Sequence, residues 1–369
     1  MSATALFLFF IILLALVIVH EFGHFIVAKW VGMRVDEFAF GFPPRLFSKK
    51  KGETVYAVNA LPLGGYVSIW GENGSEEDNA DGGAKHHPRA FGNRPKWAQF
   101  LVLIAGVVMN MLLAWIIFIA ISFGSVQMST SDPVYGSRVE NVAIMVIDAA
   151  PNSPAHLAGI VPGSVITNIK SGGAVANLTS ATSVIAFIAS HQNDSFTINY
   201  VKPNGTKAET VVAAVYGITP DKKALGITVD TVGVVNTSII EAVKIGTTRT
   251  YDITMMTLQG LWALVSSIGG ETSVLESLSG PIGIARIVGE TSEYGMAAVL
   301  TLVAILSINL AVFNALPLPA LDGGRIVVVA LEAISRKKIP FKYYSWVNVA
   351  GFVALMLLLV VVTINDVRR

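Results

Sequence analysis

Four long stretches of this sequence contain no Asp, Glu, Lys or Arg, and they restrict the possible folds more than any other feature. The stretches are residues 1–20, 97–131, 294–321 and 343–365. A helix needs about 20 apolar residues to cross the hydrocarbon core of a bilayer, so each stretch is long enough to span a membrane. Only 14% of the residues are charged, against about 25% in soluble domains. The sequence therefore predicts a polytopic α-helical membrane protein with four transmembrane helices.

The first stretch lacks the basic residues that begin a signal peptide and shows no clear cleavage pattern. We therefore expect it to be retained as the first span, within residues 1–31. The other spans are expected at residues 97–124, 294–321 and 343–365. Residues 253–270 are also uncharged, but they are rich in Thr, Ser and Gly. We expect them to belong to an interfacial helical segment over residues 236–292.

Three ionisable side chains lie at the end of the first stretch, in the sequence HEFGH. His20 and His24 are four residues apart, so a helix places both imidazoles on one face. With Glu21 after the first histidine, this is the H-E-x-x-H arrangement of two zinc ligands and a general base. Ionisable groups inside a membrane span are costly and usually functional, which disfavours a mere pair of interfacial histidines. The motif predicts zinc on His20 and His24, with Glu21 as the base.

A catalytic zinc site usually has three protein ligands and one open position. Asp322 directly follows the third uncharged stretch, and Gly323 and Gly324 come next, where they would let the backbone bend. A lone aspartate at a span end is often a helix-terminal charge. Together with the two histidines, however, Asp322 is favoured as the third ligand of one Zn2+ per chain. The chain has no cysteine, which excludes thiolate ligands and cysteine nucleophiles.

Residues 134–235 have the composition of a soluble insert. The stretch APNSPAHLAGIVPGSVITNIKSGG includes a short helix signal at residues 153–158. The stretch FTINYVKPNGTKAETVV predicts two strands around a Pro-Asn-Gly turn. These patterns resemble the PDZ domains of bacterial proteases, with another small β-rich domain as the alternative. We expect an α+β PDZ-like domain whose peptide groove lies between a strand at 143–148 and a helix at 179–190.

Residues 32–96 form a mixed segment between the first two spans. GETVYAVNALPLGGYVSIW alternates and turns like a small sheet, and the polar, Gly-rich residues 71–89 are expected to form a loop. His86 and His87 are adjacent there; metal binding is possible, but solvated loop histidines are favoured. We expect a cytoplasmic or membrane-dipping β element followed by this loop.

An ordered set of short motifs resembles the site-2 protease family of intramembrane zinc proteases. The motifs are HEFGH, LPLGGYV, AGVVMN, SGPIGIA, NLAVFNALPLPALDGG and NDVRR, in that order. With the PDZ-like insert, the chain is similar to the RseP/RasP branch of that family. Some members of the branch have two PDZ domains in tandem, whereas this chain has room for one.

The resemblance implies the same three zinc ligands and the same base. It further implies that Asn314, and with less support Asn309, holds substrate or an oxyanion. A buried amide in a span needs a hydrogen-bond partner, which helix packing alone could also supply. The resemblance also implies a membrane-dipping strand whose edge pairs with an unwound substrate by β-addition. The residues of that strand are Gly64, Gly65, Tyr66 and Val67.

Basic residues cluster after the first span and after Asp322. They are Lys29, Arg34, Arg45 and Lys49–Lys51, followed later by Arg325, Arg336–Lys338 and Lys342. The positive-inside rule makes both regions cytoplasmic. The sequence thus predicts a multi-pass protein of the inner (cytoplasmic) membrane with an extracytoplasmic PDZ-like domain. If residues 253–270 do not cross, the third span runs inward and brings Asp322 to the level of the histidines.

These features predict an intramembrane zinc endopeptidase that cleaves membrane-anchored proteins, for example an anti-sigma factor or remnant signal peptides. The resemblance implies substrates already shortened by another protease, with the PDZ-like domain acting as a size filter. The alternative is a catalytically inactive membrane adaptor that binds peptides through the PDZ-like domain, although the intact HEFGH motif opposes it. A glutamate as third ligand and a zinc transporter are disfavoured because the later spans contain few polar residues. The net charge of +1 implies no nucleic-acid partner.

Overall fold

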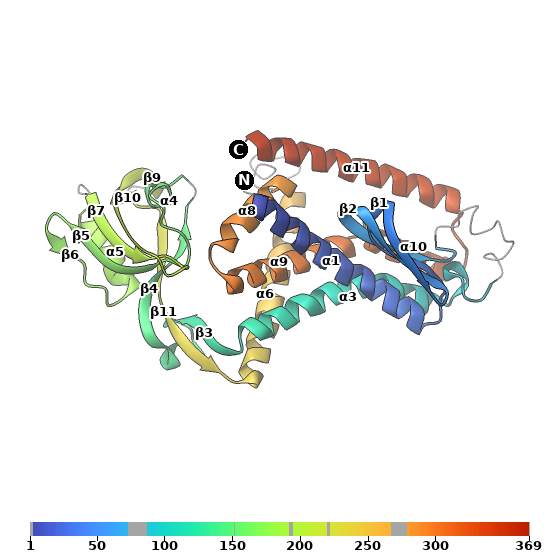
Figure 1. Cartoon of the computed structure of the whole chain (residues 1–369), viewed down its shortest axis with the longest axis horizontal. Coiled ribbons are helices and arrows are strands. Elements are labelled where there is room, and N and C mark those ends of the chain that lie inside the picture. The colour runs from blue at the N-terminus through green and yellow to red at the C-terminus, as the bar shows by residue number, and fades with distance from the viewer. Residues whose placement is uncertain are drawn as a thin grey trace. The chain divides into compact units, whose positions relative to one another are not determined.

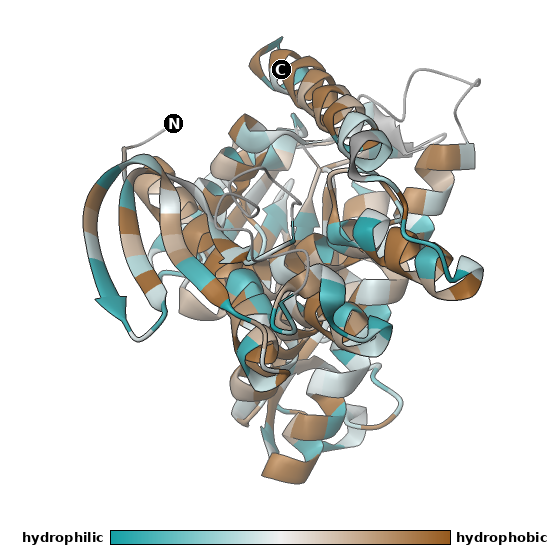
Figure 2. Cartoon of the chain, turned by 90° about the vertical axis from the view of Figure 1, so that its right-hand side faces the viewer, coloured by the Kyte–Doolittle hydropathy of each residue, from teal (hydrophilic) through white to brown (hydrophobic). Residues whose placement is uncertain are grey.

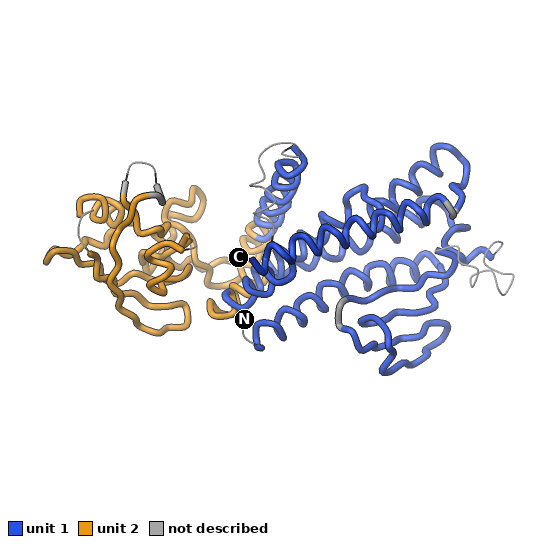
Figure 3. The backbone as a smooth tube through the Cα atoms, turned by 90° about the horizontal axis from the view of Figure 1, so that it is seen from above, with its two compact units in different colours: residues 1–118, 246–290, 300–369 blue, residues 119–245, 291–299 orange. Residues whose placement is uncertain are grey.

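The computed structural model describes residues 3–72, 87–150, 152–191, 195–219, 222–266 and 279–368. The chain divides into two compact units, which Figure 3 shows in different colours. Unit 1 comprises residues 1–118, 246–290 and 300–369, and unit 2 comprises residues 119–245 and 291–299. Unit 1 holds most of the apolar helices, and unit 2 holds the soluble insert.

Four of the described helices are long and apolar enough to cross a membrane, as the sequence predicts. They are α1 (Ala3–Trp30), α3 (Lys96–Ile121), α9 (Met296–Ala315) and α11 (Phe341–Arg368) (Figure 1). Of the four, α3 is the most buried and α11 the least. Figure 2 shows many hydrophobic (brown) residues in the helix that ends at the C-terminus, α11.

The third apolar helix is shorter than the predicted span. It ends at Ala315 rather than at residue 321, and α10 (Asp322–Ser335) begins after a short turn. The turn contains Pro317 and Pro319. Proline has no N–H to donate and its ring clashes with the preceding helical turn, so two prolines stop the helix there. Asp322 consequently begins a new helix instead of ending a span.

Two further helices follow strand β11 (Ile227–Thr237) and precede α9 along the chain. They are α6 (Ile239–Ser266) and α8 (Pro281–Ser292), and α6 begins well before the stretch 253–270 that the sequence singled out. Within unit 1, α6 lies against α3, because the Trp115 indole N–H donates to Thr247 Oγ1 at 2.9 Å. Among the described helices, α6 is not one of the four that meet the requirements of a span. Residues 267–270 lie outside the described residues, and the interfacial placement of this segment stays a prediction.

The segment after α1 forms a strongly bent hairpin of β1 (Val35–Lys51) and β2 (Thr54–Ile69). Because both strands bend, the first half of β1 pairs on both sides: Phe38 is opposite Tyr56 on one side and Val67 on the other. The second half of β1 pairs with the first half of β2. The described pairings therefore leave residues 65–69 as an edge segment, with a partner on one side only.

The polar loop that follows falls mostly outside the described residues, and so does His86. The chain is described again from His87, whose Nδ1 accepts a hydrogen bond from the backbone N–H of Arg89 at 3.1 Å. The helical turn η1 (Phe91–Asn93) then leads into α3. His87 therefore has a local partner in the loop.

Unit 2 is an α+β domain built around one antiparallel sheet, in which the order of the strands differs from their order in the chain. Its sheet order is β3-β11-β4-β5-β7-β8, with β6 paired to β5, and β9 and β10 form a separate ribbon. The strands are β3 (Gly124–Ser129), β4 (Glu140–Ala149), β5 (Val165–Ser171), β6 (Ala174–Val175), β7 (Ser195–Val201), β8 (Lys207–Ala213), β9 (Val215–Thr219), β10 (Lys222–Ala224) and β11 (Ile227–Thr237). The helical segments are η2 (Gly136–Arg138), α4 (Pro154–Leu157) and α5 (Ala181–Ser190).

The local patterns of the insert were predicted correctly. The helix signal at 153–158 corresponds to α4, and the strands around the Pro-Asn-Gly turn are β7 and β8. A core of fully buried side chains, including Val184, Phe196 and Ile198, fixes α5 on the sheet. The α+β character agrees with the sequence, and the likeness to a PDZ domain stays a prediction.

The predicted peptide groove between β4 and α5 does not match the arrangement of the strands. Helix α5 lies against β10 and β11, and the backbone N–H of Ala181 donates to Thr231 Oγ1 at 2.8 Å. Strand β3 pairs with β11 only from Val232 onward, so residues 227–230 of β11 have a strand partner only in β4 among the described pairings. A groove beside α5 would therefore be edged by β11, a neighbour that the sequence pattern does not identify.

Candidate metal site

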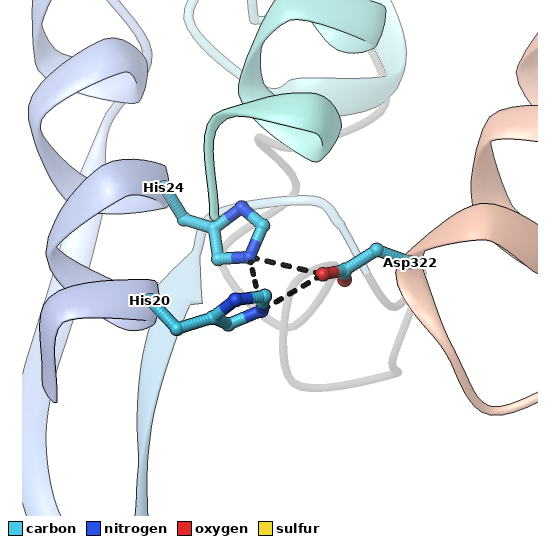
Figure 4. A group of neighbouring side chains, drawn as sticks. All are labelled: His20, His24 and Asp322. Carbon is cyan, nitrogen blue, oxygen red and sulfur yellow. Dashed lines mark hydrogen bonds and ion pairs between the residues drawn. The ribbon is translucent and has the colours of Figure 1, made fainter. Parts of the chain in front are cut away.

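Three predicted side chains meet in unit 1. His20 and His24 project from one face of α1, and Asp322 projects toward them from the start of α10 (Figure 4). Asp322 Oδ2 lies 2.9 Å from His20 Nε2 and 3.3 Å from His24 Nε2, and the two Nε2 atoms are 3.2 Å apart. Both histidines are buried. Three donor atoms thus surround one small space, although Asp322 is 302 residues from His20 in the chain.

Small residues allow the helices to come this close. A Cβ on Gly23, inside the HEFGH motif, would meet the backbone carbonyl of Ala105 in α3. A Cβ on Gly323 would meet the carbonyl of Leu316, and one on Gly324 the carbonyl of Leu318. Glycine at these positions lets α3 approach α1 and lets α10 begin tightly against the proline turn. The glycines after Asp322 therefore act through close packing.

The donor set fits a catalytic zinc ion. Two imidazole nitrogens and one carboxylate oxygen are the ligand types that such sites use, with a fourth position left open. In the described part of the chain, His20, His24 and Asp322 form the one group of metal-binding side chains whose donor atoms lie within 4.8 Å of one another. The chemistry of these donors thus agrees with the sequence motif.

A cavity of about 240 Å³ adjoins two of the three donors, His24 and Asp322. It is lined by Glu21, His24, Tyr66, Val67, Ile69, Glu72, Leu103, Asp322 and Arg325. Glu21 contributes to the wall of this cavity together with His24 and Asp322. Two of the residues from the GGYV motif, Tyr66 and Val67, line the same space.

The edge segment of β2 lies against the catalytic end of α1. A Cβ on Gly65 would be 3.8 Å from Glu21 Cγ and 2.8 Å from the carbonyl oxygen of Ala39. Gly64 has a φ of +147°, which side chains rarely adopt. Tyr66 is anchored because its hydroxyl donates to Glu37 Oε1 at 3.1 Å. The predicted substrate-pairing residues thus lie beside Glu21.

The two predicted asparagines have different surroundings. The Asn314 Nδ2 is 3.5 Å from His20 Nε2, which places this amide at the site. Asn309 is one helical turn away, and its Oδ1 accepts a hydrogen bond from Thr257 of α6 at 2.9 Å. The described contacts therefore bring Asn314 to the metal-binding group and give Asn309 a helix-packing role.

A charged pair in the cavity wall was not predicted from the sequence. Arg325 forms an ion pair with Glu72, and its Nε donates to the Tyr344 hydroxyl at 2.8 Å. The nearby Glu72 carboxylate raises the pKa of Arg325 further above its already high value. Arg325, which stays charged like any arginine, ties α10 to the turn after β2 and to α11. The sequence feature that could have revealed this role is the position of Arg325 three residues after Asp322.

Known proteins resemble this chain over almost its whole length. A family model described as peptidase family M50 matches residues 8–358. A protein of Clostridium perfringens that carries a zinc metalloprotease name is 34% identical over 361 residues, covering 96% of this chain and 95% of that protein. Zinc metalloprotease RasP of Geobacillus kaustophilus is 29% identical, covering 98% and 97%. The regulator of sigma-W protease RasP of Bacillus subtilis is 27% identical, covering 98% and 97%.

Proposed function

Because this chain belongs to peptidase family M50, the site-2 protease family, and is a multi-pass membrane zinc metalloprotease, we propose that it cleaves membrane-anchored proteins within or near their spans. One observation carries the proposal: His20, His24 and Asp322 converge on one small space, with Glu21 in the wall of the adjoining cavity. The cavity adjoins helices that are apolar enough to lie in the bilayer, where a membrane-anchored substrate would approach.

We assign zinc to His20 Nε2, His24 Nε2 and an oxygen of Asp322, one ion per chain. Bound there, zinc would supply a Lewis acid that activates water and polarises the scissile carbonyl. Glu21 acts as the base that takes the proton of the attacking water and later passes it to the leaving amine. Its place in the cavity wall supports this role because Glu21 borders the same space as His24 and Asp322.

Asn314 is proposed to hold the substrate carbonyl as charge develops on its oxygen. An amide N–H aimed at that oxygen stabilises the transition state more than the ground state. Asn314 is suited to this role by its 3.5 Å distance to His20 Nε2. Asn309 is a weaker candidate for substrate contact, because its amide oxygen already accepts from Thr257.

Residues 64–67 are proposed to bind the unwound substrate as an added strand. A helical substrate hides its peptide bonds, so cleavage requires an extended segment. The edge of β2 can pair with such a segment through main-chain hydrogen bonds. Support comes from the pairing of residues 65–69 on one side only and from the proximity of Gly65 to Glu21.

The charge pattern supports an inner-membrane location with the basic loops in the cytoplasm and unit 2 outside it. Unit 2 is proposed to act as a PDZ-like size filter that admits substrates already shortened by another protease. An anti-sigma factor is one candidate substrate, since the Bacillus subtilis relative is named a regulator of sigma-W. Remnant signal peptides are a second candidate, because they too are short membrane-anchored segments.

The alternative function is a catalytically inactive adaptor that binds peptides through unit 2, and Glu21→Gln separates the two. The amide is nearly isosteric with the carboxylate but cannot accept the water's proton. We expect the variant to keep its zinc and fold and to lose about 10²- to 10⁴-fold in cleavage of a single-span substrate in lipid nanodiscs. Cleavage at the wild-type rate would refute Glu21 as the base, and wild-type protein that cleaves no membrane substrate would favour the adaptor.

A further inference from the structure

The motif AGVVMN in α3 has no role in the chemistry described above, yet it lies directly beside the two histidines. Three positions of α3 spaced by four residues face them: Val102, Gly106 and Asn110. The Val102 carbonyl lies 2.7 Å from His24 Nδ1. A Cβ on Gly106 would be 2.5 Å from His24 Nε2 and 2.6 Å from His20 Cε1. Asn110 Nδ2 lies 3.3 Å from His20 Nδ1. One stripe of α3 therefore lines both imidazoles, with Val102 and Asn110 at their Nδ1 atoms and Gly106 between the rings.

Metal binding through Nε2 determines what the other ring nitrogens need. A neutral imidazole that offers Nε2 to a metal carries its proton on Nδ1, and that N–H needs an acceptor. For His24 the acceptor is the carbonyl oxygen of Val102. His20 requires an acceptor as well, and Asn110 is the side chain within reach of its Nδ1.

Asn110 has an oxygen free to fill this role. The residue is fully buried, and its Oδ1 is one of the few buried side-chain oxygens without a hydrogen-bond partner among the described residues. Rotating the amide by 180° exchanges Oδ1 and Nδ2 with almost no change in shape. In that orientation Oδ1 accepts the Nδ1–H of His20, which the Nδ2 group, a donor only, cannot do.

We propose that Asn110 is a positioning residue that accepts the Nδ1–H of His20 and so holds Nε2 toward the metal. Gly106 leaves the space that the two rings occupy, and Val102 provides the matching acceptor for His24. The proposal rests on the ligand assignment made above. The alternative is that Asn110 serves only to pack α3 against a neighbouring helix. The contact from Ser307 Oγ at 2.8 Å goes to the Asn110 backbone carbonyl, however, and needs no amide side chain.

The test compares two substitutions of similar size in the full-length protein. Asn110→Leu removes both donor and acceptor, whereas Asn110→Asp keeps an acceptor and removes the donor. Zinc affinity is measured by competition with a chelator, with thermal unfolding as the check on folding. We expect Asn110→Leu to weaken zinc binding about 10- to 100-fold, and Asn110→Asp to remain within a few-fold of wild type. Ser307→Ala, which removes the neighbouring α3–α9 contact, should bind zinc as wild type does.

Wild-type zinc affinity in a folded Asn110→Leu protein would overturn the proposal. An equal loss in Asn110→Asp would overturn it too, because the amide N–H would then be the group that matters. If Asn110→Leu does not fold, Asn110→Asp decides alone. Failure of the ligand assignment is distinguishable, since His24→Ala and Asp322→Asn would then both retain zinc.

Discussion

At the scale of single residues, the site depends on small side chains as much as on its ligands. Gly23 and Gly106 lie on facing helices, and a Cβ on either would meet α3 backbone or a histidine ring. Protein interiors are closely packed and tolerate an added methyl group poorly, so alanine at Gly106 would push the imidazoles away from Asp322. Ligand identity and ligand placement therefore come from different residues.

The ligand assignment predicts the metal content of single variants. Purified wild-type protein should contain about one zinc per chain, because three ligands are sufficient for a catalytic site. His24→Ala should lose most of it, and Asp322→Asn should bind it much more weakly because an amide oxygen is a poorer ligand than a carboxylate. Elemental analysis after dialysis against a weak chelator measures this. His156→Ala and Asp252→Asn, which alter residues outside the site, are the matched controls, and undiminished zinc in both ligand variants would place the metal elsewhere.

The sequence singles out the three side chains that meet in the structure, but it does not identify the residues of α3 that contact them. The i, i+4 spacing in HEFGH defines one helix face, and Asp322 is the acidic residue that directly follows the third uncharged stretch. The facing residues of α3 depend on how that helix is rotated about its axis, which an almost uniformly apolar stretch does not specify. The sequence feature that could have indicated the face of α3 next to the histidines is Asn110, a polar residue in such a stretch, four positions after Gly106. For the same reason, the contact between Asn309 and Thr257 was not predictable.

At the scale of elements, β1 and β2 show where pattern reasoning stops. Alternation predicted strands in this segment correctly. The double pairing of Phe38 with Tyr56 and Val67 arises from bends in both strands, and an alternating pattern does not reveal a bend. The end of α9 is the opposite case, because Pro317 and Pro319 are visible in the sequence and account for the turn before Asp322.

The edge segment beside Glu21 allows a test of substrate pairing. Successive backbone N–H groups of a strand point to opposite sides in an antiparallel sheet, so one of Tyr66 and Val67 directs its N–H away from β1. Proline at that residue should lower cleavage about fivefold or more while zinc content and thermal stability stay unchanged. Proline at the other residue should destabilise the hairpin.

Two controls accompany this experiment. Tyr66→Phe removes only the hydroxyl contact to Glu37, and Gly260→Ala adds a methyl group in open space on α6. Wild-type cleavage by whichever proline variant remains stable would argue against strand addition.

At the scale of the whole molecule, the path of the chain through the bilayer determines whether His20 and Asp322 lie at the same membrane face. Four described helices meet the requirements of a span, and α6 does not. An even number of crossings between the first and last basic loops is needed to bring Asp322 to the same membrane face as His20. Their 2.9 Å separation thus agrees with a helix α6 that does not cross.

Single-cysteine labelling tests this path cleanly, because the native chain contains no cysteine. Cysteines at Ser195 and Ser279 flank α6, while cysteines at Lys51 and Ser335 lie in the basic regions. An impermeant thiol reagent added to intact cells or spheroplasts should label the first two and leave the last two unlabelled. Opposite labelling of Ser195 and Ser279 would show that α6 crosses the membrane.

The filter role of unit 2 can be tested by a deletion that the fold itself suggests. The backbone N–H of Thr130 donates to the carbonyl of Thr231 at 2.8 Å, and β3 pairs with residues 232–237 of β11. Replacing residues 131–230 with an Asn-Gly turn therefore keeps a two-stranded hairpin. The shortened protein should still cut a pre-trimmed substrate and should begin to cut one with a large folded outer domain.

A recruiting role for unit 2 gives the opposite result in the same membranes. If unit 2 captures the new C-terminus of a trimmed substrate, the deletion should slow cleavage of that substrate strongly. The deletion variant carrying Glu21→Gln is the blank for both substrates, and retained zinc shows that the site survived the deletion.

The distance in sequence between His20 and Asp322 has a consequence for biosynthesis. The two histidines emerge from the ribosome near the start of translation, whereas the carboxylate that completes the assigned ligand set emerges 302 residues later. A nascent chain, or one cut short by premature termination, inserts its HEFGH helix into the membrane without the means to hold zinc tightly. Proteolytic competence is thereby deferred until nearly the entire polypeptide has been made.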